Sequence, residues 1–322
     1  MLRAVMSCVL VLALGACTSE QLSPQARDEA ASQQKTQQKS QQRAQQKSQS
    51  RSQSSSSSAP TRSALTGAYD EYVALGDSFT AGPLIAPEDP NGGACGRSLV
   101  NYPHLLAERL DVDALRDVSC SGASTEHLTQ RQSNLFGTNP PQFRALSPST
   151  DLVTLGIGGN DFGVFAELVT TCARARAADP EGAPCGDRLA DVTDVFAQTQ
   201  KRLVDALHGV RRRSPEAEVV VVGYPQLAPA RGTCPDVLPF ADGDYIFARR
   251  VERQLNRALR QAARSAQAEF VDVAGPSQGH SACAGEQAWV NGRRAVDGEA
   301  LSYHPLERGM AAVADLVYAE LG

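Results

Sequence analysis

Short apolar runs alternate with longer amphipathic stretches along most of this 322-residue chain. The apolar runs have the length of buried strands and cover residues 72–75, 115–120, 152–157, 219–223 and 270–273. Between them, apolar residues recur every three or four positions, the pattern of a helix with one buried face. The clearest of these stripes run over residues 189–210, 251–266 and 306–321. The alternation predicts one α/β domain over residues 65–322, with a parallel sheet covered by helices on both faces.

Residues 1–17 follow a different pattern. Arg3 precedes an apolar run at 5–14, which is too short to cross a bilayer because a spanning helix needs about 20 residues. This arrangement is typical of an export signal. The small residues Gly15 and Ala16 precede Cys17 as in a bacterial lipobox, so we predict cleavage before Cys17 and lipidation of its thiol. The protein is then an outward-facing membrane lipoprotein, or a secreted protein if Cys17 is incidental.

Residues 18–64 are dominated by Gln, Ser, Lys and Arg. Too few apolar side chains are present to offset the entropy of ordering, so we predict a disordered tether. Seven basic and three acidic residues give this segment a net charge of +4, which with Arg3 leaves −10 for residues 65–322 out of a total of −5. The tether could lie on anionic lipid while the acidic domain stays away from it, or it could be a solvated linker.

Ser78 follows the first apolar run directly, in the sequence Gly76-Asp77-Ser78. Ligands of open α/β sheets bind just outside the carboxyl ends of the strands, so the Ser78 hydroxyl is a candidate nucleophile. Gly, Asp and Ser are also common turn residues, and the tripeptide alone decides nothing. Two later blocks strengthen the functional interpretation: Asn160 closes the third apolar run, and His304 precedes the last helical stripe.

These blocks resemble the SGNH (GDSL) hydrolase family, whose four named residues correspond in order to Ser78, Gly122, Asn160 and His304. The resemblance implies a three-layer α/β/α sandwich with a flavodoxin-like parallel sheet. It further implies a Ser78–His304 pair and an oxyanion hole formed by the main-chain N–H groups of Ser78 and Gly122 and the side-chain amide of Asn160. The α/β-hydrolase fold fits less well, because its Gly-x-Ser-x-Gly motif needs glycine where this chain has Thr80.

His304 is the candidate general base. Pro305 suits the first position of a helix, which would put His304 at or beside the N-cap, where the helix dipole disfavours a charged ring. Many family members place an aspartate three residues before this histidine, but here that residue is Leu301. We predict that the Leu301 backbone carbonyl orients the ring, with the carboxylates of Asp297 and Glu299 as alternatives. The other four histidines are predicted to be structural.

Six cysteines lie in the predicted domain: Cys95, Cys120, Cys172, Cys185, Cys234 and Cys283. An even number in an exported domain indicates disulfides, although six cysteines allow 15 pairings. Sequential pairing closes the three shortest separate loops, and the resemblance to actinobacterial secreted members implies the same arrangement. The absence of any Cys-x-x-Cys pair makes a zinc site the weaker alternative, and we predict no metal or cofactor.

The predicted function is a carboxylic ester hydrolase, an esterase or lipase with a lipid ester as substrate. Apolar stretches at 83–85, 162–165 and 237–240, together with Tyr303, are candidates for an acyl groove or for ordinary packing. The resemblance also leaves a carbohydrate O-deacetylase as an alternative, and loss of catalysis would leave a non-catalytic envelope binding module. We expect a monomer without a nucleic-acid partner.

Overall fold

The computed structural model describes residues 65–134, 137–188 and 192–322. The predictions for the signal at 1–17, for Cys17 and for the tether at 18–64 therefore lie outside the described residues, as does the start of one helical stripe at Leu189. All four blocks that carry the family resemblance fall inside them.

Five strands form a single parallel sheet in the order β2-β1-β5-β6-β7. Their bounds are β1 Glu71–Gly76, β2 Ala114–Asp117, β5 Leu152–Gly156, β6 Glu218–Val222 and β7 Glu269–Val271. This is the flavodoxin-like order, in which the chain first adds a strand on one side of β1 and then continues on the other side, beginning with β5. Ligands bind at this switch point, outside the carboxyl ends of β1 and β5. The predicted sandwich is confirmed.

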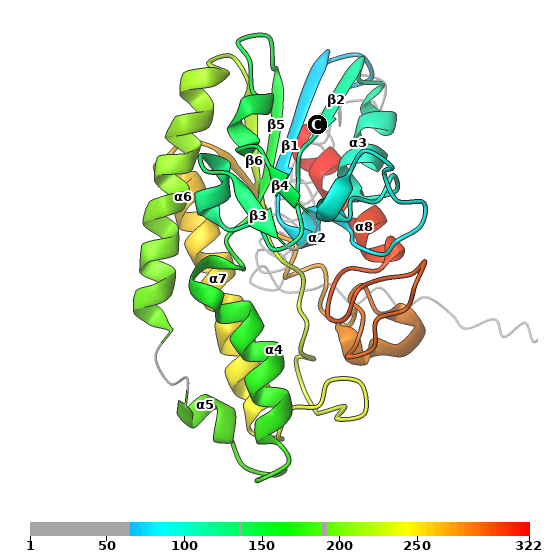
Figure 1. Ribbon diagram of the computed structural model, residues 1–322, viewed down its shortest axis with the longest axis vertical. Coiled ribbons are helices and arrows are strands. Elements are labelled where there is room, and N and C mark those ends of the chain that lie inside the picture. Colours follow the sequence, from blue (N-terminus) through cyan, green and yellow to red (C-terminus); the bar gives the residue numbers. More distant parts are fainter. Residues whose placement is uncertain (1–64, 135–136, 189–191) are drawn as a thin grey trace, which may run out of the picture. The chain divides into compact units, whose positions relative to one another are not determined.

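Helices cover both faces of the sheet (Figure 1). One face packs against α3 (Tyr102–Leu110) and α8 (Glu307–Leu321), and the other against α6 (Thr193–Arg213) and α7 (Asp244–Ser265). Side chains of β1 alternate between the faces, so Tyr72 and Ala74 lie in one core cluster and Val73 and Leu75 in the other. All four are fully buried, which explains the uninterrupted apolar run in the sequence.

The remaining elements lie at the edges of this sandwich. The helices are α2 (Ser78–Ala81), α4 (Val164–Ala175) and α5 (Pro184–Arg188), and the hairpin strands are β3 (Gln132–Asn134) and β4 (Gly137–Asn139). Five short 3-10 helices complete the described structure: η2 Gly93–Cys95, η3 Thr125–Leu128, η4 Gln142–Ala145, η5 Asp161–Gly163 and η6 Ala282–Gln287. The predicted strand at 115–120 is shorter than expected, because after Asp117 the chain turns into the loop that contains Cys120.

Three disulfides join Cys95 to Cys120, Cys172 to Cys185, and Cys234 to Cys283. The sequential pairing is therefore confirmed. In the chain-entropy model a disulfide contributes about 2–4 kcal/mol to stability by restricting the unfolded chain. Bridges of this kind persist in oxidising compartments, which is consistent with export.

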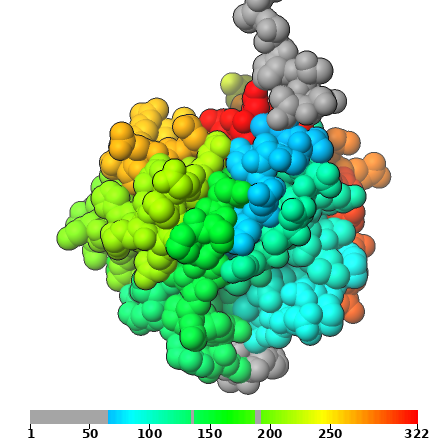
Figure 2. All heavy atoms as spheres, turned by 90° about the horizontal axis from the view of Figure 1, so that it is seen from above, coloured from blue at the N-terminus to red at the C-terminus, as the bar shows by residue number. Residues whose placement is uncertain are grey.

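The two ends of the described domain lie at the edge where the strands begin. Leu65 packs in the same core cluster as Leu321 at the end of α8. Figure 2 views this edge, with the first described residues in blue beside the end of α8 in red. No helix within the described part of the chain is both long enough and apolar enough to cross a membrane.

Candidate active site

Ser78 lies at the tight turn where β1 passes into α2. Asp77 caps the helix by accepting a hydrogen bond from the Phe79 N–H at 2.9 Å, and Ser78 is the first helical residue. Glycine is required at 76, because a Cβ there would lie 2.2 Å from Thr80 Oγ1. The turn holds the Ser78 side chain at the carboxyl edge of the sheet, with 4% of the residue exposed.

His304 lies 226 residues later in the chain and meets Ser78 directly. Its Nε2 is 2.8 Å from Ser78 Oγ, and its Nδ1 is 2.7 Å from the carbonyl oxygen of Ser302. A carbonyl only accepts, so Nδ1 carries the hydrogen and Nε2 is left to accept the serine proton. Burial lowers the pKa of His304 to about 4, although the hydrogen bond to Ser302 acts in the opposite direction. The ring is therefore neutral at physiological pH, as a general base must be.

The structure corrects two predictions about this histidine. The carbonyl that meets Nδ1 belongs to Ser302, while the Leu301 carbonyl accepts the backbone N–H of His304 at 3.2 Å. Asp297 and Glu299 are exposed and play no part in this contact. Tyr303 has a φ of +62°, and this left-handed residue lets the chain turn so that the Ser302 carbonyl reaches the ring. The expected backbone-carbonyl partner is present, but one residue further along than predicted.

The second correction concerns the helix that follows. α8 begins at Glu307 with Leu306 as its N-cap, so Pro305 is not the first helical residue and His304 precedes the cap by two positions. Burial is the main cause of the lowered pKa of His304.

Gly122 and Asn160 lie on neighbouring loops at the same edge. The Asn160 Nδ2 donates to the carbonyl of Ala123, the residue after Gly122, at 3.0 Å. Gly122 has a φ of +75°, and a Cβ there would meet only Gln132 Nε2 at an ordinary 3.7 Å. The positive φ therefore favours glycine at this position, because residues with a side chain rarely adopt this backbone conformation.

Asp161 joins these two loops. Its carboxylate accepts hydrogen bonds from the Thr125 backbone N–H at 2.8 Å and the Thr125 hydroxyl at 2.7 Å, and the residue is 1% exposed. From the sequence alone, Asp161 cannot be distinguished from an ordinary turn residue. Its position beside Asn160 is the signal that could have identified it.

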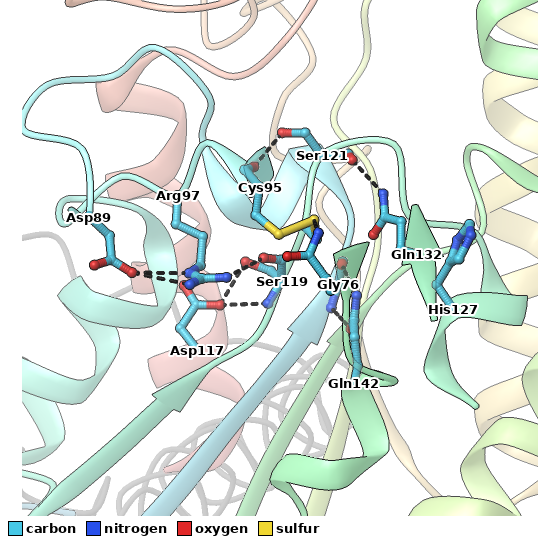
Figure 3. Close-up of a disulfide and its surroundings, with 12 residues drawn as sticks. Gly76, Asp89, Cys95, Arg97, Asp117, Ser119, Ser121, His127, Gln132 and Gln142 are labelled. Atoms are coloured by element: carbon cyan, nitrogen blue, oxygen red, sulfur yellow. Dashed lines mark hydrogen bonds and ion pairs between the residues drawn. A yellow bond between two sulfur atoms is a disulfide. The ribbon is translucent and has the colours of Figure 1, made fainter. Parts of the chain in front are cut away.

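The Gly122 loop is also fixed from its other side (Figure 3). The Cys95–Cys120 disulfide ends two residues before Gly122. The main-chain N–H and the hydroxyl of Ser121 both donate to the Cys95 carbonyl, and Gln132 Nε2 donates to the Ser121 carbonyl at 2.8 Å. Gly122 lies within this framework, which limits how far its N–H can move.

Gln142 holds the end of β1 and was not identified from the sequence. Its side-chain amide donates to the Gly76 carbonyl at 2.8 Å and accepts from the Gly76 N–H at 2.9 Å (Figure 3). The side chain thus pairs with the strand end as a neighbouring strand would. Gly76 lies only two residues before Ser78, so this contact supports the turn.

A narrow, mainly apolar cavity of about 40 Å³ lies beside Ser78. At 10–15 Å³ per water it has room for roughly three water-sized groups. The apolar side chains around it come from α2, from the start of α4, from α6, from α7 and from the segment after β6: Phe79, Val164, Phe165, Leu168, Phe196, Pro225, Leu227, Val251 and Leu255. Of the candidate stretches for an acyl groove or for packing, only 162–165 lines this cavity, and Tyr303 does not. Ile85, Leu238 and Phe240 are buried in the core.

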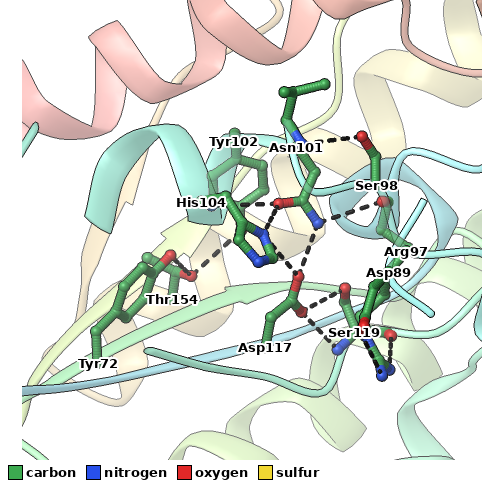
Figure 4. A network of polar contacts seen from close by, with 12 residues as sticks. Tyr72, Asp89, Arg97, Ser98, Asn101, Tyr102, His104, Asp117, Ser119 and Thr154 are labelled. Carbon is green, nitrogen blue, oxygen red and sulfur yellow. Dashed lines mark hydrogen bonds and ion pairs between the residues drawn. The ribbon is translucent and has the colours of Figure 1, made fainter. Parts of the chain in front are cut away.

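Three of the other histidines make local contacts away from Ser78. His104 Nδ1 lies 2.7 Å from Asn101 Oδ1, and Asn101 Nδ2 in turn donates to Asp117 and to the Ala81 carbonyl at the end of α2 (Figure 4). His127 caps η3, and His280 stacks on Trp289. Among residues 65–134, 137–188 and 192–322, no cluster of three or more His, Cys, Asp or Glu side chains is arranged to bind a metal ion.

A buried Ser–His pair at the switch point of a flavodoxin-like sheet defines a hydrolase of the SGNH type. Comparison with known proteins agrees: the GDSL-like Lipase/Acylhydrolase family matches residues 74–312, and the chain belongs to this family. It is 42% identical to Lipase 2 of Streptomyces coelicolor over 218 residues, which cover 66% of this chain and 72% of that protein.

Two crystal structures have the same fold. A phospholipase A1 from Streptomyces albidoflavus NA297 is 30% identical with a TM-score of 0.66, and an extracellular lipase from Streptomyces rimosus is 27% identical with a TM-score of 0.67. Each alignment covers 78% of this chain and 99% of the other. The protein is therefore a carboxylic ester hydrolase.

Proposed function

We propose that the protein hydrolyses lipid esters through a Ser78–His304 pair and an acyl-enzyme intermediate. The observation that carries the proposal is the chain of contacts from Ser78 Oγ to His304 Nε2 and from His304 Nδ1 to the Ser302 carbonyl. His304 takes the serine proton as Oγ attacks the ester carbonyl, and it returns the proton to the departing alcohol. Water then repeats the sequence to release the acid.

Negative charge develops on the carbonyl oxygen during each attack. The Ser78 N–H, the Gly122 N–H and the Asn160 amide are the proposed donors. Two observations support these donors. The Asn160 amide donates a hydrogen bond to the carbonyl of the residue after Gly122, and Asn160 lines the Ser78 cavity. Removing one donor of this kind typically slows turnover about 10²- to 10³-fold. We expect Asn160→Ala to lower kcat within that range.

The cavity supports an acyl substrate over a purely polar one, because most of its wall is apolar. Its small volume fits the first carbons of an acyl chain, with the remainder of a longer chain leaving through the opening. A series of p-nitrophenyl esters of increasing chain length tests this. Phe196 is 5% exposed and lines the cavity, so Phe196→Ala should shift the preferred chain to greater length. A preference for acetyl esters in both the parent protein and the Phe196→Ala variant would favour the deacetylase alternative.

The catalytic pair is tested by labelling with a fluorophosphonate, which reacts with activated serines. Parent protein should be labelled, and Ser78→Ala should not. Ser214→Ala is the matched control, since Ser214 is also fully buried but bonds the Ser147 carbonyl, on the loop that leads into β5, at the edge where the strands begin. Labelling that survives in Ser78→Ala would refute the proposed nucleophile.

We further propose that the protein is exported and anchored through a lipid on Cys17. The lipobox-like residues and the three disulfides support this. Leu65, the first described residue, lies at the edge where the strands begin, whereas Ser78 lies at the edge where they end. An anchored domain would thus be attached at the end opposite its active site. Cys17→Ser should release the protein from the membrane fraction if the anchor is present.

A further inference from the structure

Tyr224 is a buried residue that connects two turns of the active site. It follows β6 after Gly223 and is 7% exposed. Its hydroxyl donates to Asp77 Oδ2 at 2.5 Å and accepts the main-chain N–H of Gly159 at 2.9 Å. Asp77 immediately precedes Ser78, and Gly159 immediately precedes Asn160. One hydroxyl therefore joins the turn of the nucleophile to the turn of the side-chain oxyanion donor.

The main chain of Tyr224 is held in place by a third element, the helix α7. Asn256 on α7 accepts the Tyr224 N–H at 2.8 Å and donates to the Tyr224 carbonyl at 3.1 Å. The same amide nitrogen donates to the Glu252 carbonyl one helical turn earlier. Because both main-chain groups of Tyr224 are bonded to a long helix, its position does not depend on either of the turns that it joins.

The ring also packs against both turns. Its centroid lies 5.2 Å from that of Phe79 in an edge-on arrangement, and a Cβ at position 159 would lie 3.3 Å from the ring. Phe79 continues this contact to the imidazole of His304, with centroids 5.3 Å apart. The hydroxyl and the ring thus have separable roles: the ring fills space, and the hydroxyl sets the alignment.

We propose that Tyr224 is a positioning residue for ester hydrolysis, whose hydroxyl holds Ser78 Oγ and the Asn160 amide at the separation that the transition state needs. β1 and β5 pair as far as Gly76 and Gly156, and beyond those residues the two turns leave the sheet. Removing the hydroxyl leaves the Gly159 N–H without its acceptor and Asp77 Oδ2 without its donor. Unpaired buried groups cost free energy, so the turns would shift to find other partners. The proposal rests on the Ser78 mechanism proposed above.

Tyr224→Phe tests the proposal because it keeps the ring and removes only the hydroxyl. Misplacing reacting groups by about 1 Å can slow an enzyme about 10²-fold. We expect kcat to fall about 10- to 100-fold, with KM for a soluble p-nitrophenyl ester little changed. The rate of fluorophosphonate labelling should fall in parallel, since the phosphonyl oxygen occupies the same oxyanion site.

Tyr245→Phe is a closely matched control. The Tyr245 hydroxyl also accepts a main-chain N–H, from Cys234 at 2.9 Å, and donates to an oxygen, the Leu238 carbonyl. The residue is 1% exposed and does not line the Ser78 cavity. Both variants should lower the melting temperature, but only Tyr224→Phe should lower kcat. A kcat for Tyr224→Phe within twofold of the parent, or an equal loss in Tyr245→Phe, would overturn the proposal.

Asp77→Asn gives an independent result if Tyr224→Phe does not fold. The introduced amide oxygen can still accept the Phe79 N–H, but its nitrogen leaves the Tyr224 O–H without an acceptor. We expect the same selective loss of kcat, and an unchanged kcat would refute the bridge. Ser78→Ala separates the two proposals. If Ser78→Ala keeps full activity, the proposed mechanism is wrong. If Ser78→Ala is inactive and Tyr224→Phe keeps full activity, only the positioning role of Tyr224 is wrong.

Discussion

The two members of the Ser78–His304 pair are held in different ways. Ser78 lies between a strand and a helix, with side chains bracing the turn: Asp77 caps α2, and Gln142 bonds both polar groups of Gly76. His304 lies in an irregular segment, and the carbonyl of Ser302 orients its ring. Side chains specify the first arrangement and the path of the main chain specifies the second. A side-chain brace can be removed by substitution, whereas a carbonyl survives almost any substitution of its residue.

The largest expected effect removes the pair itself. Ser78→Ala and His304→Ala should each reduce kcat to near background, and the double variant should be no slower than the slower single variant. The two residues act as one unit, and in a comparable serine hydrolase the loss from such changes is about 10⁶-fold and not additive. Steady-state kinetics of the three variants decide this. A double variant much slower than both singles would mean that the two residues act separately.

The same contrast explains what could be predicted from the sequence. Parallel strands leave apolar runs, so the five strands of the main sheet were predictable, although the β3–β4 hairpin was not. The motif residues Ser78, Asn160 and His304 follow from their sequence motifs. Ser302 left no signal, because every residue has a carbonyl and only the left-handed Tyr303 turns this one toward the ring. Tyr224 and Gln142 were missed because their partners lie 147 and 66 residues away.

Gln142→Ala tests the side-chain brace on the serine side. The residue is 4% exposed, and its removal leaves the Gly76 N–H without its acceptor. An unsatisfied buried group costs about 1–3 kcal/mol, so the free energy of unfolding should fall by that amount. The kcat should fall as well, because the end of β1 is then free to move. Ser214→Ala, which also loses a buried bond to a carbonyl, should lose stability but not kcat. Equal kcat in both variants would contradict a role for Gln142 in positioning.

The pH dependence of kcat/KM tests the burial of the histidine side. An exposed histidine has a pKa of about 6.5 and would be mostly protonated at pH 5. Burial lowers the pKa of His304 to about 4, so its basic form persists at pH 5 and is lost only as the pH falls through 4. We expect the acidic limb of the profile near pH 4. Burial also raises the pKa of Asp77 to about 7. An acidic limb near pH 7 that is absent in the Asp77→Asn variant would therefore report the titration of Asp77. An acidic limb near pH 6.5 that persists in the Asp77→Asn variant would contradict a buried His304.

The smallest expected effect on kcat comes from the two carboxylates near His304, and it tests most directly whether the main chain orients this histidine. Asp297→Asn and Glu299→Gln should each leave kcat within about twofold of the parent, because both side chains are exposed and Nδ1 of His304 already donates to the Ser302 carbonyl. In enzymes where a carboxylate holds the histidine, neutralising it can cost about 10⁴-fold in kcat. Ser302→Ala should likewise have little effect, since it keeps the carbonyl. Ser302→Pro would instead test the main-chain path, because proline fixes φ and also restricts Leu301 before it. If Ser302→Pro lowers kcat while Ser302→Ala does not, the main chain and not the serine side chain orients His304. If Asp297→Asn or Glu299→Gln lowers kcat by 10³-fold or more with an unchanged melting temperature, a carboxylate and not the Ser302 carbonyl orients His304.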